Sequence, residues 1–88
     1  MAWTINYSAS ALKSLKKMDR QSAKRIFDFL ENRIATLEDP RVSGKPLKGD
    51  LGIFWRYRVG DYRVLCEIQV GQLVILAALI GHRKEIYL

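Results

Sequence analysis

The sequence predicts a single α+β domain in which an N-terminal strand and a helix hairpin pack on one face of an antiparallel sheet. Three observations predict it: a short alternating stretch at residues 3–7, two helical patterns before residue 40, and three alternating stretches after residue 53. A chain of 88 residues forms one hydrophobic core and leaves no room for a second domain. We therefore expect residues 1–88 to form one domain with element order β-α-α-β-β-β.

The first strand is expected at residues 3–7, where large apolar residues alternate with polar ones. Ser8 or Ser10 is then placed to cap a first helix, and Asp19 is placed to cap a second, longer one. Six apolar residues recur at helical spacing in the second helix: Ala23, Ile26, Phe27, Leu30, Ile34 and Leu37. We expect Pro40 to end it. Two helices joined by so little chain should form an antiparallel hairpin.

The C-terminal half predicts a loop followed by an antiparallel meander. The loop covers residues 41–52 and has room for a short extended piece. The strands are expected at residues 54–59, 62–70 and 73–80. Gly60-Asp61 and Gly71-Gln72 would join them, since both pairs suit two-residue hairpin turns.

Alternation along these strands sorts their side chains onto two faces. The helix hairpin should cover the apolar face, which collects Trp55, Tyr57, Val59, Tyr62, Val64, Cys66, Ile68, Val70, Leu73, Ile75, Ala77 and Leu79. The opposite face collects Phe54, Arg56, Arg58, Arg63, Leu65, Glu67, Gln69, Val74, Leu76, Ala78 and Ile80, with Gly81 and His82 following. This second face is predicted to be a cationic surface with apolar patches.

The placement of the arginines predicts an anion-binding site. The chain has 15 Lys and Arg against nine Asp and Glu, an excess that favours nucleic acid, anionic lipid or an acidic protein as partner. The Gly60-Asp61 turn would set Arg58 directly opposite Arg63, and like charges facing across a ladder destabilise it. Arg56 shares their face, and Arg83 follows the neighbouring strand. Guanidinium groups grip phosphate oxygens in a bidentate fashion, so phosphate is the favoured anion.

Two further residues near the C-terminus are candidates for chemistry. His82 is followed by Arg83 and Lys84, and these cations favour a neutral imidazole that can take or give a proton near pH 7. A single histidine is weak evidence for chemistry, and the residues alone favour an incidental role. Tyr87 can stack on a base or donate a hydrogen bond, or it can pack the end of the chain.

Other kinds of site lack their residues. One His and one Cys do not make a usual zinc site, and there is neither a glycine-rich phosphate loop before a helix nor a Ser-His-acid set. We expect no metal and no small-molecule cofactor. Cys66 has no partner for an intrachain disulfide, and no stretch approaches the length of a membrane span. These features predict a cytoplasmic protein that has no membrane partner.

Three motifs, taken with the two N-terminal helices, resemble one known family. They are Lys45-Pro46-Leu47-Lys48-Gly49, the run from Trp55 to Arg63, and Gly81-His82-Arg83-Lys84-Glu85-Ile86-Tyr87. In order, spacing and chain length the sequence resembles the RelE branch of the RelE/ParE toxins of bacterial toxin-antitoxin systems. The resemblance implies a RelE-like fold and a ribosome-dependent endoribonuclease that cuts mRNA in the A site of the 30S subunit. It also implies a cognate antitoxin protein as partner.

The same resemblance suggests residue roles. It places Arg56 and Arg58 where RelE carries basic residues on its second strand, Arg63 at an arginine that follows a tyrosine, Arg83 at a late arginine, and Tyr87 at the C-terminal tyrosine. His82 lies where RelE has a lysine and some relatives use a histidine. The expected catalytic residues are therefore Arg58, Arg63, His82, Arg83 and Tyr87. The expected RNA-binding residues are Arg56, Lys45, Lys48 and Lys84.

The expected reaction is attack of an RNA 2′-hydroxyl on the adjacent phosphate. Arg58, Arg63 and Arg83 suit stabilisation of the phosphorane charge, but a guanidinium does not lose its proton near neutral pH. The general base is therefore His82 or Tyr87. A ParE-like toxin that inhibits DNA gyrase without cutting RNA is the alternative, and a plain nucleic-acid-binding module is a third class.

Overall fold

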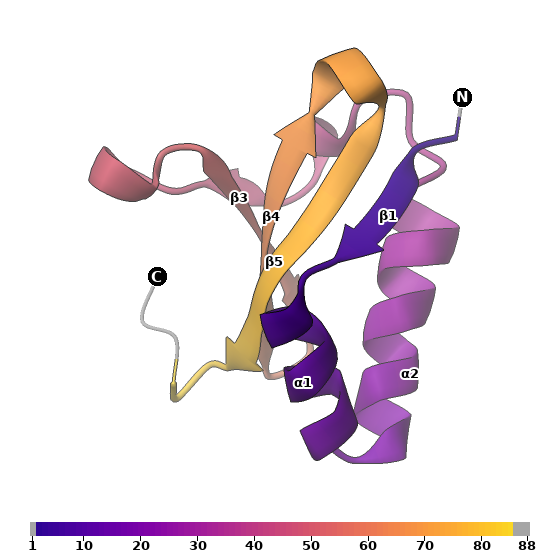
Figure 1. Cartoon of the computed structure of the whole chain (residues 1–88), viewed down its shortest axis with the longest axis vertical. Helices are drawn as coiled ribbons and strands as arrows, with labels where there is room; N and C mark the ends of the chain where they lie inside the picture. Colours follow the sequence, from indigo (N-terminus) through magenta and orange to yellow (C-terminus); the bar gives the residue numbers. More distant parts are fainter. Residues whose placement is uncertain (1, 86–88) are drawn as a thin grey trace.

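The computed structural model describes residues 2–85, which form a five-stranded sheet with two helices on one face (Figure 1). The elements follow in the order β1 Thr4–Tyr7, α1 Ala9–Lys17, α2 Arg20–Phe29, β2 Lys45–Pro46, β3 Phe54–Val59, β4 Tyr62–Gln69 and β5 Val74–His82. The strands lie in the order β1-β5-β4-β3-β2. The predicted α+β class and the order of the main elements are confirmed.

The sheet is mixed rather than wholly antiparallel. Strands β2 to β5 pair antiparallel, as predicted, whereas β1 joins the edge of the sheet parallel to β5. A parallel neighbour has to be reached by a long connection, which here contains both helices and the meander. Alternation in a strand of four residues gives no information about the direction of its partner, so this pairing was not predicted.

Both predicted helix caps are present. The Ser8 Oγ accepts a hydrogen bond from the Ala11 N–H at 3.0 Å, and the Asp19 carboxylate accepts one from the Ser22 N–H at 2.9 Å. The second helix ends earlier than predicted, because α2 runs into a π-helical turn at Leu30–Ile34 and stops there. The Ala35 carbonyl leaves the helix and accepts from the Trp3 N–H at 2.7 Å, five residues before Pro40.

The β3–β4 hairpin has the predicted two-residue turn. Gly60 has a φ of +59°, which glycine adopts without strain, and Val59 pairs with Tyr62 across the turn. Arg58 therefore pairs directly with Arg63. The β4–β5 connection differs from the prediction, since residues 70–72 form a 3₁₀ turn and Leu73 is left-handed with a φ of 53°.

A β-bulge in β5 shifts the alternation of its side chains. Leu65 pairs with Leu79, but the next residue on β4, Cys66, pairs with Ala77, so Ala78 is an extra residue in β5. Ser8 holds this bulge, because its Oγ donates to the Ala78 carbonyl at 2.7 Å. The predicted faces of Leu79 and Ile80 were consequently wrong: Leu79 is 38% exposed, whereas Ile80 is buried at 2%.

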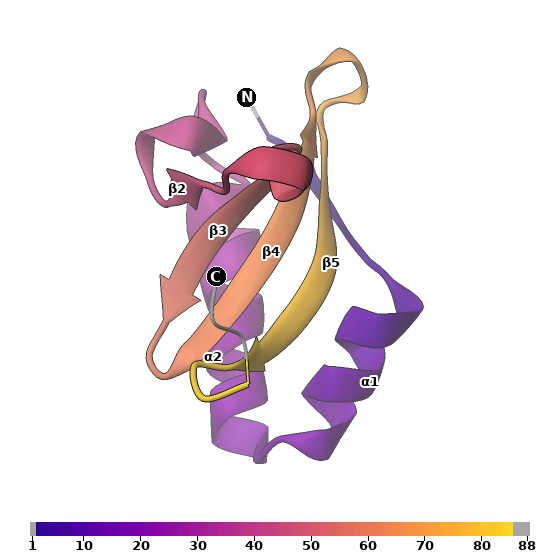
Figure 2. The ribbon, with the colours of Figure 1, turned by 90° about the vertical axis from the view of Figure 1, so that its left-hand side faces the viewer.

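The core lies between the helices and the sheet. Its fully buried side chains include Ile26, Leu30 and Ile34 from the second helical segment and Tyr57, Val64 and Ile75 from the strands. Burial raises the pKa of the Cys66 thiol, also in this core, to about 12. Figure 2 looks onto the other face, where β3, β4 and β5 lie in front of α2. Neither α1 nor α2 covers this face, although the 3₁₀ turn Gly49–Leu51 lies in front of its upper end in Figure 2, and we call it the open face.

Candidate functional site

The β3–β4 hairpin brings the predicted arginines together on the open face. Arg58 and Arg63 pair directly, and Arg56 lies two residues before Arg58 on the same face. On its other side Arg63 pairs with Gly81 of β5, a residue that has no side chain. The pKa of Arg63 is lowered, first by desolvation and then by Arg58, Arg56 and Arg83. We call these four residues the arginine cluster.

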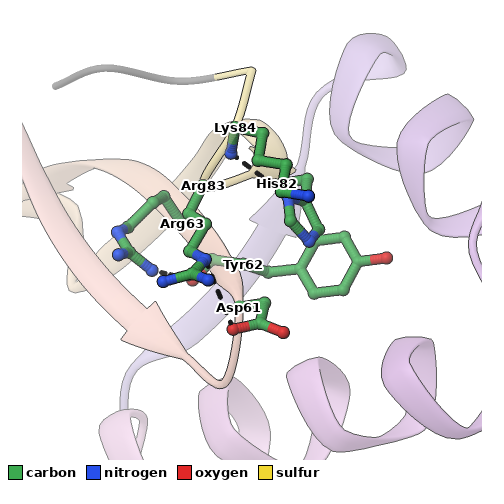
Figure 3. Close-up of polar contacts among 6 residues, drawn as sticks. All are labelled: Asp61, Tyr62, Arg63, His82, Arg83 and Lys84. Carbon is green, nitrogen blue, oxygen red and sulfur yellow. Dashed lines mark hydrogen bonds and ion pairs between the residues drawn. The ribbon is translucent and has the colours of Figure 1, made fainter.

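Arg83 reaches the cluster because the hairpin turn holds it. Its backbone N–H donates to the Asp61 carbonyl at 2.7 Å, and its Nε lies 3.6 Å from the Asp61 Oδ1 (Figure 3). Both side chains are more than half exposed, so this ion pair orients Arg83 and adds little stability. Glu67 lies on the same face as the cluster, and its carboxylate accepts a hydrogen bond from the Gln69 amide at 3.3 Å. Asp61 was missed, although it stands in the predicted turn beside the Tyr62-Arg63 dipeptide.

His82 lies on the opposite side of the sheet from these guanidinium groups. It pairs with Tyr62, and the two rings meet edge to face at 5.5 Å. Figure 3 shows both rings directed away from Arg63 and Arg83. The expectation that His82 follows the cationic face was wrong, because the Ala78 bulge turns the end of β5 over. His82 instead lines a cleft of about 300 Å³ with residues of α1.

The imidazole of His82 has a fixed role in the turn that follows β5. Its Nδ1 accepts a hydrogen bond from the Lys84 N–H at 3.1 Å, and its own N–H donates to the Glu85 Oε1 at 3.2 Å. Because Nδ1 is the acceptor, the neutral ring carries its hydrogen on Nε2. Such a ring can accept a proton only at Nδ1, where it would lose the bond to Lys84. Its arrangement therefore favours holding the turn over acting as a base.

The predicted RNA-binding lysines fall into two groups. Lys45 pairs with Arg56 across β2 and β3, and Lys48 lines the same cleft as both, with a volume of about 380 Å³. Lys84 is exposed in the turn after β5, at the other end of the sheet. Tyr87 lies outside the described residues. Within residues 2–85 no group of His, Cys, Asp and Glu side chains is arranged to hold a metal ion. None of the described helices is both long and apolar enough to cross a membrane.

A family comparison agrees with this geometry. The model of the family described as "ParE toxin of type II toxin-antitoxin system, parDE" matches residues 5–87, nearly the whole chain. The chain belongs to the RelE/ParE toxins. The resemblance drawn from the sequence motifs is thus confirmed at the level of this superfamily.

Individual relatives of this RelE/ParE toxin are distant in sequence but close in fold. Toxin RelG of Mycobacterium tuberculosis is 25% identical over 87 residues, which cover 99% of this chain and 98% of RelG. In the toxin-antitoxin complex RelBE2 of the same organism, one chain superposes with a TM-score of 0.86 at 23% identity, covering 94% of this chain and 93% of that one. A mutant of Escherichia coli RelE in the free state gives a TM-score of 0.76 at 19% identity, covering 99% and 90%.

Proposed function

We propose that this RelE/ParE toxin is a ribosome-dependent endoribonuclease that cleaves mRNA in the ribosomal A site. The observation that carries the proposal is the arginine cluster, in which Arg58 and Arg63 face each other across a ladder and Arg83 is tied beside them. A fold gains nothing from such a like-charge pair. The phosphate of an RNA backbone would supply the missing negative charge and accept bidentate hydrogen bonds.

The proposed reaction divides its tasks among these residues. The 2′-oxygen attacks the phosphorus, the bond to the 5′-oxygen breaks, and the extra negative charge on the phosphorane is stabilised by Arg58, Arg63 and Arg83. A guanidinium does not act as the base. His82 holds the turn that carries Arg83 through its bond from Lys84, so we assign to Tyr87 the transfer of the 2′-hydroxyl proton to the leaving 5′-oxygen.

The partners follow from this assignment. The chain supplies charge and shape more than acid-base groups, so orientation of the mRNA by the ribosome would contribute much of the rate. We expect weak cleavage of free RNA. A cognate antitoxin is the expected inhibitor, since similar folds are found in complexes with RelB antitoxins, and the toxin would act in the cytoplasm, where translation takes place.

Primer extension on mRNA in a purified translation system tests the proposal. The wild type should cut at A-site codons only when ribosomes are present, and Arg83→Ala should cut at least a hundredfold more slowly. Lys13→Ala is the matched control, because Lys13 is an exposed cation on α1, away from the cluster. Cleavage by Arg83→Ala at the wild-type rate would contradict the assignment.

Inhibition of DNA gyrase is the second candidate function, and the match to the ParE toxin model favours it. In this case the purified protein would inhibit gyrase-catalysed supercoiling and leave mRNA intact on the ribosome. The two assays run on the same preparation separate the functions. Growth arrest with gyrase inhibition and without cuts in mRNA would replace the nuclease proposal.

A further inference from the structure

A second cationic surface lies beside the arginine cluster, along the seam between α2 and the edge of β3. Two clefts of about 350 and 380 Å³ adjoin there, because Phe29, Arg33 and Arg58 line both of them. Lys45 lines the first cleft, and Arg25 lines the second. We call this surface the α2–β3 groove and define it by these five residues.

The helical side of the groove is built at four-residue spacing. Arg25, Phe29 and Arg33 follow one another along one side of the second helical segment. The guanidinium carbon of Arg33 lies 5.8 Å from the centre of the Phe29 ring, so the aromatic ring holds this cation in place. The Phe29 ring packs edge to face against Tyr57 at 5.8 Å, which fixes the ring in turn.

Arg25 is held at the other end of the groove by the hairpin turn. A Cβ atom added at Gly60 would lie 2.8 Å from the Arg25 Nη1, so the absence of a side chain there lets the guanidinium lie on the turn. The turn therefore carries Arg25 on its helical side and Arg83 on its open side. Two arginines from distant segments are brought to one two-residue turn.

The groove has a large excess of positive charge. Four of its lining residues are cations: Arg25, Arg33, Lys45 and Arg58. Asp28 lines the second cleft, but none of these four cations has a carboxylate within 4.0 Å among residues 2–85. The exposed large apolar residues of the described chain are Leu12, Val42, Ile53, Val70 and Leu79, and all lie outside the groove. The groove therefore lacks exposed apolar anchors for an amphipathic helix, and its cations suit a ligand with a run of negative charge.

We propose that the α2–β3 groove binds the phosphate backbone of single-stranded RNA next to the phosphate held by the arginine cluster. This proposal rests on the proposed nuclease function. Arg58 belongs to both surfaces, so a strand that crosses the cluster is led along β3 into the groove. The contacts are to phosphate rather than to bases, since Arg33 and Tyr57 already pack against the Phe29 ring. Binding in the groove should therefore be independent of base sequence.

Fluorescence anisotropy with a 2′-O-methyl RNA of about twelve nucleotides tests the proposal. This RNA lacks the attacking hydroxyl and is not cleaved. Its length lies within the roughly 4–16 nucleotides that a single-strand-binding fold covers. The variant is Arg25→Ala/Arg33→Ala. Its matched control is Lys13→Ala/Lys24→Ala, which removes the same charge from exposed positions outside the groove. Arg63→Ala reports on the cluster.

Loss of two phosphate contacts should reduce the slope of log affinity against log salt by about 1.4. At 0.1 M salt this corresponds to binding about 25-fold weaker than wild type. The control should change the slope by much less. Thermal unfolding shows whether Arg25→Ala/Arg33→Ala folds. If it does not, Arg25→Ala replaces it, because the Arg25 side chain lies on the turn and outside the Phe29 packing. Loss of this one contact should lower the slope by about 0.7.

Two results would contradict RNA binding in the groove. In the first, the groove variants bind RNA like the control while Arg63→Ala binds weakly, and the nuclease proposal then stands. In the second, a wild type that does not bind RNA even at low salt would overturn the groove, and the ribosome assay alone would then decide the nuclease proposal. Binding of a poly-glutamate peptide, measured in parallel, tests whether the groove binds an acidic protein segment instead. If the groove variants weaken binding of this peptide and not of RNA, the groove binds an acidic protein segment and the proposal is wrong.

Discussion

Arg58→Gln should make the protein more stable and less active. In the native hairpin Arg58 lies directly opposite Arg63, and the acid nearest the turn, Asp61, pairs with Arg83. A cross-strand pair contributes roughly 0.2–1 kcal/mol, and like charges destabilise by a comparable amount. Removal of the Arg58 charge should therefore raise the free energy of unfolding by about 0.2–1 kcal/mol. For a domain of this size, that corresponds to a rise in Tm of about 1–8 °C.

Thermal unfolding at two salt concentrations distinguishes this cause from others. The difference between variant and wild type should be present at 0.05 M salt and nearly absent at 1 M salt, where the screening length falls to about 3 Å. Lys13→Gln lowers the net charge equally on α1 and corrects for the general repulsion in a basic chain. In the ribosome assay, Arg58→Gln should cleave about a hundredfold more slowly. A variant less stable than wild type at low salt, or a stability gain that persists at 1 M salt, would refute the electrostatic argument.

Three further perturbations test the fold and the turn. Tyr57→Phe should lower the free energy of unfolding by about 1–3 kcal/mol, because the buried Pro40 carbonyl loses its 2.6 Å hydrogen bond from the tyrosine hydroxyl; urea unfolding measures it. The pKa of Asp19 is lowered first by a hydrogen bond from the Ser22 side chain and then by the bond from the Ser22 N–H, so its stabilising effect is present at neutral pH and lost as the pH falls below about 4. Asp19→Asn should remove this part of the acid sensitivity in a series of melts across pH. His82→Asn should keep most of the cleavage rate, because an amide oxygen can accept from the Lys84 N–H, whereas His82→Leu should lose it.

Each of these three predictions has an outcome that would contradict it. Tyr62→Phe is matched to Tyr57→Phe and removes a hydroxyl from a half-buried ring on the same face of the sheet. Equal losses from the two tyrosine variants would show that the bond to Pro40 is not the cause. If Asp19→Asn loses stability at low pH as the wild type does, protonation of Asp19 is not a cause of the acid sensitivity. Equal inactivation of His82→Asn and His82→Leu would make the ring itself part of the chemistry.

The features predicted well from the sequence are those set by a few neighbouring residues. Gly60 supplies the positive φ that a two-residue hairpin requires, so the register of β3 and β4 and the meeting of Arg58 with Arg63 followed from local chemistry. Ser8 and Asp19 capped the helices because their side chains reach backbone N–H groups three residues ahead. The cationic half of the site could thus be predicted.

The features missed depend on contacts between distant segments. The early end of the second helix depends on the Trp3 N–H, and the bulge at Ala78 is held by the hydroxyl of Ser8, seventy residues away in the sequence. An apolar run such as Val74 to Ile80 fits either phase of alternation, so the pattern gave no sign of an extra residue. The face occupied by His82 was wrong for this reason, and the role of Asp61 required the position of Arg83.

The bulge decides which side chains stand at the end of β5. If the same residues paired without it, Ala78 would lie opposite Leu65, Ile80 would leave the core, and His82 would follow on the side of the guanidinium groups. The hydroxyl of Ser8 donates to the carbonyl of the extra residue and so favours the observed arrangement. A residue near the start of the chain therefore helps to keep an apolar side chain buried and a titratable ring away from the arginine cluster near its end.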